Sequence, residues 1–313
     1  GKPLKDHVHT PDWSTEKRLN YTKNCIQILG RLLPKNMEGS ISTSPISYRH
    51  WHKTNLEKKN IIKLACQHLT LIICELIRLK QTTGTVIHLD LEPEPDGMIE
   101  TSQECVDFFN DHLIPFAKPI ISDTFNRKNT DAEKLIKDHI QICFDVCHFA
   151  VGFENPKEAI NTIQNAGIKI GKIQISAALS SGEISIKNRE KIKTELRQFD
   201  EPIYLHQAII KSKNGKLKHF KDLGNALNNI TSDSKEIRTH YHVPIFTTQF
   251  KTLRSTQLEI IETLNEWKKS NFSNHIEVET YTWEILPKEL QTNTIDTIVR
   301  ELDWVKSQLN KSK

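Results

Sequence analysis

Strand-like and helix-like segments alternate along most of this 313-residue chain. Short β-branched runs at 86–91 and 168–175 are separated from their neighbours by segments with the apolar spacing of helices, for example 102–116 and 155–166. Strands that alternate with helices form parallel sheets, because each helix carries the chain back to the start of the next strand. The sequence has no glycine-rich phosphate loop. We therefore expect a TIM (β/α) barrel rather than a doubly wound nucleotide-binding fold.

The number of predicted strands is about seven, one or two βα units short of an eight-stranded barrel. Asn214-Gly215 is a hairpin signal, so we expect a hairpin insertion near 203–220. The chain starts at Gly1 without a methionine. The sequence thus predicts one barrel domain over 1–313, incomplete at its N-terminus, with the strand at Ser40 unpaired on one side. The predicted strands are 39–45, 86–91, 140–146, 168–175, 203–210, 236–246 and 276–281.

The strand at 140–146 ends in chemically active side chains. Ile142, Phe144 and Val146 share one parity, which places Asp145 on the other face of an otherwise apolar strand. Burying an unpaired carboxylate costs several kcal/mol, so Asp145 needs a partner. His148 follows three residues later, where a carboxylate and an imidazole can surround one cation. The alternative is an Asp hydrogen-bonded to local backbone beside a surface His.

Four other strands carry polar side chains on one parity in the same way. In a barrel, chemistry gathers at the carboxyl ends of the strands, so these side chains are expected to meet there. They are His88, Asp90 and Glu92, followed by Glu94 and Asp96; Lys172, Gln174 and Ser176; His240 and His242; and Glu277 and Glu279.

A subset of these residues has the composition of a divalent metal site. Carboxylate and imidazole donors suit Zn²⁺, Mn²⁺ or Mg²⁺, and the absence of sulfur ligands argues against a structural zinc. Without a cation, three carboxylates in one cavity repel and raise one another's pKa. The alternative is a plain hydrogen-bonded barrel core. The predicted ligands are Glu92, Asp145, His148, His242 and Glu279, with Gln174 and His240 near them.

Roles in catalysis and substrate binding follow from the same pattern. Glu92 and Glu279 are predicted to act as an acid/base pair across a substrate. For Lys172, an acid role competes with a structural ion pair, which we consider the better interpretation. The predicted catalytic set is Glu92, His148, Lys172 and Glu279, and the predicted substrate contacts are Glu94, Gln174, His206, His240 and Trp283.

Composition and charge narrow the class of protein. With 37% hydrophobic and 26% charged residues the chain is expected to be globular and soluble. Its net charge of +4 is weak and its lysines form no single stripe, so no nucleic-acid partner is expected. Six cysteines in apolar runs indicate reduced thiols and a cytoplasmic protein. We find no signal peptide and no apolar run long enough to cross a bilayer.

Several stretches resemble a known family. They are 39–43, 91–95, 144–148, 172–179, 242–246 and 279–283, and they occur in family order. They are similar to the metabolite-traffic protein EboE family, within the xylose isomerase-like TIM barrels. The resemblance implies metal ligands at Glu92, Asp145, His242 and Glu279, with His148 as a ligand or substrate contact. Gln174 stands where related barrels often carry a metal-binding histidine. The resemblance to the family also implies that the protein binds a small-molecule metabolite and has protein partners from a metabolite-traffic cluster.

Four functions compete at this point. The first is an EboE-like, metal-dependent barrel that acts on or binds a small secondary-metabolite precursor. The second is a sugar or sugar-phosphate isomerase or epimerase, with proton transfer next to a carbonyl. The third is a non-catalytic binding barrel. A phosphodiester nuclease needs several metals and a basic groove, and the weak charge argues against it.

Overall fold

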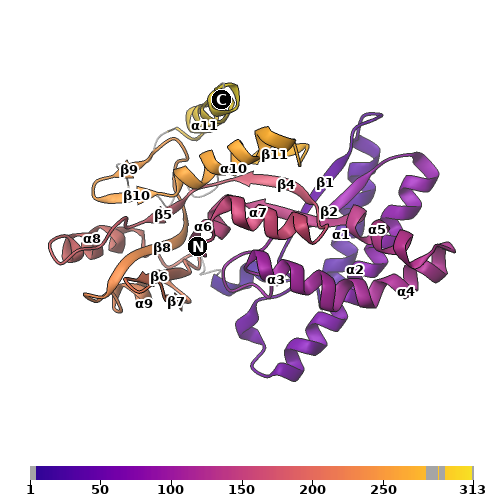
Figure 1. Ribbon diagram of the computed structural model, residues 1–313, viewed down its shortest axis with the longest axis horizontal. Coiled ribbons are helices and arrows are strands. Elements are labelled where there is room, and N and C mark those ends of the chain that lie inside the picture. The colour runs from indigo at the N-terminus through magenta and orange to yellow at the C-terminus, as the bar shows by residue number, and fades with distance from the viewer. Residues whose placement is uncertain (1–4, 280–287, 289–292, 312–313) are drawn as a thin grey trace.

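A curved parallel sheet of five strands forms the centre of the protein, in the order β1-β2-β3-β4-β11 (Figure 1). The computed structural model describes residues 5–279, 288 and 293–311. Each neighbouring pair of strands is parallel, as the alternation of strands and helices predicts. The strands are β1 (Gly39–Thr43), β2 (Ile87–Leu91), β3 (Ile140–Asp145), β4 (Ile170–Ile175) and β11 (His275–Val278).

Helices connect these strands, and their ends follow local capping rules. The long helix α2 begins at a capping box formed by Thr54 and Glu57, and it ends at Gly84, whose φ of 76° suits glycine. The helices predicted at 16–33, 102–116 and 155–166 are present, whereas α5 was not predicted. The helices of this part are α1 (Glu16–Leu32), α2 (Asn55–Thr83), α3 (Ser102–Asp107), α4 (Ile114–Phe125), α5 (Asn129–His139), α6 (Val146–Val151), α7 (Pro156–Asn165), α10 (Gln257–Ser270) and α11 (Thr294–Asn310). The short helical turns include the 3₁₀ turn η1 (Lys5–His9) and the π-helical turn Phe108–Leu113.

A second sheet of six antiparallel strands corrects the predicted barrel. The segments predicted as barrel strands at 203–210 and 236–246 belong to this sheet instead, in the order β7-β6-β8-β5-β10-β9. The hairpin predicted near 203–220 is confirmed, because β6 and β7 pair antiparallel around Gly215 (φ 86°). β7 and β8 lie on the two sides of β6 and both pair antiparallel with it, and the short helix α9 (Leu223–Leu227) lies between them in the chain. The strands are β5 (Ala178–Ser180), β6 (Ala208–Ser212), β7 (Leu217–Phe220), β8 (Ser234–His242), β9 (Gln249–Phe250) and β10 (Leu253–Ser255), and α8 (Arg189–Leu196) follows β5.

The parallel sheet is a half-barrel that does not close within the described residues. β1 pairs only with β2, so the strand at Ser40 has one free edge, as predicted. The sheet curls nonetheless: Asn274, just before β11, donates a hydrogen bond of 2.7 Å from its side chain to Glu38 Oε1, just before β1. The two edges of the sheet therefore approach each other at the amino ends of the strands.

Both faces of the parallel strands are buried, but they differ in chemistry. In β2, Ile87 lies against α1, where its Cδ1 is 3.9 Å from the position that a Cβ on Gly30 would take. Leu89 and Leu91 share its parity and are fully buried. His88 and Asp90, on the other parity, face the concave side and are equally buried. This alternation gives the half-barrel an apolar outer layer and a polar interior.

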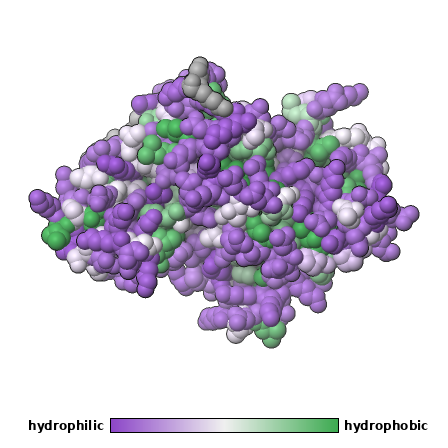
Figure 2. Space-filling view, in the orientation of Figure 1, coloured by the Kyte–Doolittle hydropathy of each residue, from purple (hydrophilic) through white to green (hydrophobic). Residues whose placement is uncertain are grey.

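Helix α2 contradicts the expectation that no apolar segment could cross a bilayer. By length and composition, Asn55–Thr83 meets that criterion, with half of its most apolar window buried inside this fold. Leu69, Ile72, Ile73 and Leu76 are fully buried, as expected of a core helix. On the face drawn in Figure 2, hydrophilic surface predominates and hydrophobic residues form small, separate areas.

The helix α11 contains a buried acid that should make stability depend on pH. Burial raises the pKa of Glu301 from 4.5 to about 7. Its Oε1 accepts a hydrogen bond of 3.0 Å from the Ile245 N–H, and its Oε2 has no hydrogen-bond partner among the described residues. Because the folded pKa lies above the unfolded one, this contribution to stability is complete below pH ~4.5 and is lost as the pH rises through 7.

We expect the substitution Glu301→Gln to remove this loss of folding stability at high pH. Its free energy of unfolding should match that of the parent near pH 4.5 and exceed it by about 3 kcal/mol at pH 8.5. Urea unfolding across this pH range measures the difference, with Asp303→Asn, an exposed acid on the same helix, as the control. Parallel pH profiles for parent and Glu301→Gln would contradict the prediction.

Candidate functional site

Three carboxylates and one amide meet at the carboxyl end of the parallel sheet. Gln174 Nε2, on β4, lies 3.0 Å from Glu92 Oε1, 3.1 Å from Asp145 Oδ2 and 2.8 Å from Glu279 Oε2. Glu92 and Glu279 directly follow β2 and β11, and Asp145 ends β3. An amide NH₂ has two protons to donate, so it cannot satisfy three ionised carboxylates at once.

Asp145 forms the buried floor of this cluster. Its side chain has no exposed surface, whereas those of Glu92 and Glu279 are 19% and 27% exposed. Asp145 Oδ1 accepts hydrogen bonds from the His148 N–H at 3.0 Å and the Ser176 hydroxyl at 2.7 Å, and it caps α6. Burial alone would raise the pKa of Asp145, but the charge of His148 and hydrogen bonds from the Glu279 and Ser176 side chains hold it below its usual value.

The other two carboxylates are held in their protonated forms near neutral pH. Burial, with repulsion from Asp145, raises the pKa of Glu92 to about 8. Burial, with repulsion from Asp145 and Glu92, raises the pKa of Glu279 to about 10. Nearby positive charge is thus too small to ionise all three acids, and a cation among them would reverse both shifts.

A cluster of histidines adjoins the carboxylates. His148 Nδ1 faces the Pro93 carbonyl at 2.9 Å, and His240 Nδ1 faces Gln207 Oε1 at 3.0 Å. The Gln207 amide nitrogen donates to the Pro95 carbonyl, which fixes its oxygen toward His240. Both Nδ1 atoms are therefore donors, and the two Nε2 atoms face each other at 3.1 Å. This contact requires either one shared proton or a cation between them.

The pKa values of these rings favour a shared proton in the absence of a cation. Burial lowers the pKa of His148, but Asp145 and Glu92 outweigh that effect and hold it above its usual value. Burial and the neighbouring His148 lower the pKa of His240 well below its usual range. If the two rings share one proton, His148 is therefore the ring that holds it and donates to His240.

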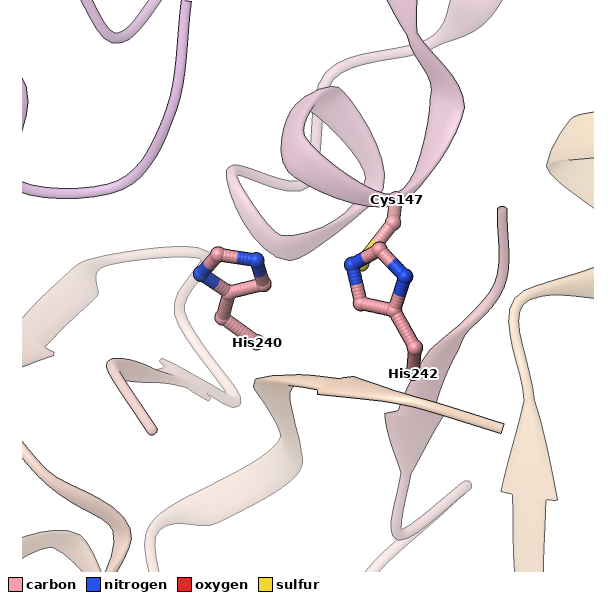
Figure 3. A group of neighbouring side chains, drawn as sticks. All are labelled: Cys147, His240 and His242. Carbon is pink, nitrogen blue, oxygen red and sulfur yellow. The ribbon is translucent and has the colours of Figure 1, made fainter. Parts of the chain in front are cut away.

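Cys147 brings a sulfur atom to this cluster, which corrects the expectation of an oxygen and nitrogen ligand set. In Figure 3, His240 and His242 extend from β8 toward Cys147 on α6. The candidate ligand atoms of these three residues all lie within 4.8 Å of one another. The same holds for Glu92, Asp145 and His148. Cys147 shares the parity of Asp145, two residues before it, and this parity was a usable signal.

Other predicted site residues have different surroundings. Lys172 forms an ion pair of 2.6 Å with Glu277, the structural alternative preferred from the sequence. His206 uses Nδ1 on the His240 carbonyl and Nε2 on Glu201, so both of its ring nitrogens are engaged. Trp283 lies outside the described residues.

Glu94, two residues after Glu92, has a partner that the sequence did not indicate. It pairs at 3.0 Å with His9, whose ring stacks on Tyr48. Burial would raise the pKa of Glu94, but His9 holds it below its usual value. The polar segment before residue 13 showed no pattern, so nothing predicted that η1 would bring a buried histidine here. Ser176, which donates a hydrogen bond to Asp145, was among the side chains expected to face inward, whereas Gln207, which orients His240, was not predicted.

Comparisons with known proteins add little to this description. No family model matches the chain, so the resemblance to the EboE family stays a prediction. No curated protein matches it. Among solved structures, the apo form of the 3-keto-D-glucoside 4-epimerase YcjR from E. coli matches over 94% of this chain and 73% of its own, at 13% identity and a TM-score of 0.43. At this identity and TM-score, the likeness supports no statement about the reaction.

Proposed function

We propose that this protein is a metal-dependent isomerase or epimerase of a small polyhydroxylated metabolite. The observation that carries the proposal is the convergence of Glu92, Asp145 and Glu279 on one amide nitrogen at 2.8–3.1 Å. Three clustered acids that nearby positive charge cannot keep ionised are a fit for a divalent cation. The same acids are the groups that proton transfer next to a carbonyl requires.

The cation would be held by Asp145, Glu92 and Glu279, with His242 as a nitrogen donor. When bound, it would neutralise the carboxylates and polarise a carbonyl or diol of the substrate. His242 lies close enough to contribute, with Nδ1 3.5 Å from Glu279 Oε2. Burial lowers the pKa of His242 to about 4, which keeps its imidazole neutral, as a ligand must be.

Glu92 and Glu279 are the acid/base pair in this proposal. They are the partly exposed acids of the cluster, so a substrate that enters from solvent reaches them before Asp145. One takes a proton from the carbon next to the carbonyl, and the other returns a proton to the product.

The rival functions keep the same pocket and differ in turnover. An EboE-like trafficking role, with protein partners from a metabolite cluster, and a non-catalytic binding barrel both predict binding without proton exchange. Proton exchange at carbon is therefore the property that separates the proposed enzyme from a binder.

We expect the Mn²⁺- or Zn²⁺-loaded protein to exchange solvent deuterium into at least one member of a panel of ketoses and keto-sugars, as NMR would detect. Glu92→Gln and Glu279→Gln should lower the rate about 10²–10⁴-fold, the usual contribution of an acid or base. Glu277→Gln, two residues before Glu279 on the same segment, is the matched control and should keep the parental rate. If metal and sugar bind but no deuterium enters, the protein is a binder and the proposed reaction is wrong.

A further inference from the structure

A second cluster of metal-ligating side chains lies at the opposite end of the parallel sheet. Glu38 precedes β1, His88 lies in β2, and His275 begins β11. Glu38 Oε1 is 4.0 Å from His88 Nε2 and 3.9 Å from His275 Nε2. The two imidazole rings meet edge to face with centroids 5.4 Å apart. Two histidines and one glutamate are a known zinc ligand set.

His88 is held in the tautomer that a metal ligand needs. Its Nδ1 lies 2.6 Å from Asp90 Oδ1, and Asp90 has no exposed surface. Ser40 donates a hydrogen bond of 2.5 Å to the other oxygen of Asp90. An ionised carboxylate only accepts, so Nδ1 carries the proton and Nε2 presents its lone pair on the side of Glu38. A carboxylate behind a histidine is the usual support of a metal ligand.

The other two side chains are also poised for a cation. Asn274 orients Glu38 through its hydrogen bond of 2.7 Å to Oε1. His275 Nε2 is buried and has no hydrogen-bond partner among the residues that the structure describes. Buried polar atoms are normally paired, so this nitrogen lacks the partner that a metal would supply.

An ion has both room and access at this position. Glu38 and His275 line an open groove of about 870 Å³, together with residues 33–37 and 83–86. A tetrahedral zinc with bonds of about 2.0–2.1 Å separates its donor atoms by about 3.3–3.4 Å. Glu38, whose side chain is 35% exposed, therefore has to move by roughly half an ångström. The positive charge of the nearby Lys172 is paired with Glu277.

We propose that Glu38, His88 and His275 bind a zinc-class divalent cation that clasps the two free edges of the parallel sheet. Glu38 belongs to the β1 edge and His275 to the β11 edge, which no strand pairing joins within the described ranges. A cation bound by both replaces the missing strand pairing with metal–ligand bonds. Its fourth position faces the groove, where water or a small anion completes the coordination. This site is separate from the proposed catalytic cluster and does not depend on it.

We call the proposed zinc site of Glu38, His88 and His275 the clasp. Zinc binding and thermal stability test it without any assay of activity. The full chain is stripped with chelator and titrated with Zn²⁺ alone, followed by melting with and without the ion. His275→Gln and Glu38→Gln, at partly exposed positions, should each bind one equivalent fewer than the parent, or bind that equivalent at least 10–100-fold more weakly. They should also lose a zinc-dependent rise in Tm of several degrees that the parent shows. His219→Gln, a half-exposed histidine elsewhere, controls for adventitious binding.

This experiment tests the existence of each of the two proposed metal sites separately. If only the clasp exists, the parent binds one equivalent and His275→Gln binds none, whereas Asp145→Asn binds as the parent does. If only the catalytic site exists, Asp145→Asn loses the ion and His275→Gln keeps it. Zinc stoichiometry, affinity and Tm in His275→Gln and Glu38→Gln equal to those of the parent would overturn the clasp.

Discussion

In Asp145→Asn, the dissociation constant for Mn²⁺ or Zn²⁺ at the carboxyl end of the sheet should rise by one to several orders of magnitude. Asp145 is the fully buried acid of the three, so its oxygen is the donor that a bound cation cannot replace with water. The asparagine keeps the shape and an oxygen toward His148 N–H and Ser176, but it removes the charge. Calorimetric titration of stripped protein measures the constant.

Two further variants separate the loss of a ligand from the loss of charge or support. Asp138→Asn removes a carboxylate that pairs with Lys169 outside the site, and it should leave the affinity unchanged. Ser176→Ala removes only a hydrogen bond to Asp145, so its effect should stay within about 10–100-fold. If Asp145→Asn binds the ion like the parent and melts earlier in chelator, Asp145 is a structural hydrogen-bond acceptor and the site assignment is wrong.

Gly171→Ala should be among the most destabilising single substitutions in the parallel sheet. A Cβ at this position would lie 2.2 Å from Asp90 Oδ1 and 2.7 Å from His88 Nδ1. Overpacking of a buried site typically costs 1–3 kcal/mol, and here it also displaces a buried hydrogen-bonded pair. We expect a loss of about 3 kcal/mol in the free energy of unfolding, together with weaker zinc binding at the clasp, because His88 loses its support.

The matched control is Gly30→Ala in α1. There the added Cβ would meet Leu79 at 3.4 Å, an ordinary contact, and alanine favours a helix over glycine by about 1 kcal/mol. Urea unfolding should therefore show Gly30→Ala at or slightly above the stability of the parent. Equal stability for Gly171→Ala and the parent would mean that the His88–Asp90 pair moves aside at little cost, and the clasp argument would lose its support.

The polar interior was predictable because parallel strands in register repeat the same geometry. Asp145 pairs in register with Gln174, and Gln174 with Glu277, so strand-end side chains of one parity lie at similar heights around the sheet. The parity of each strand could be read from its apolar residues. That is why the meeting of Glu92, Asp145 and Glu279 followed from the sequence alone, although their chemical roles stay predictions.

The second sheet and the clasp could not be predicted in the same way. Whether β8 joins a barrel or an antiparallel sheet depends on long-range pairing with β5 and β6; β6 and β8 read as ordinary strands, and β5 was not predicted. The contact between Glu38 and His275 depends on how far the sheet curls, which no local pattern encodes. His88 has the parity of Glu92 but lies at the other end of its strand, so parity alone assigned it to the wrong cluster.

The central claim is that the carboxylate cluster binds a divalent cation, and elemental analysis tests it most directly. The measurement uses His275→Gln protein, which lacks the clasp, purified without chelator or added metal, alongside the double variant His275→Gln/Asp145→Asn. The account predicts about one equivalent of zinc or manganese per chain in the first and close to none in the second. The account would be contradicted if the His275→Gln protein contained no metal and took up none on titration. It would also be contradicted if both proteins contained equal amounts of metal.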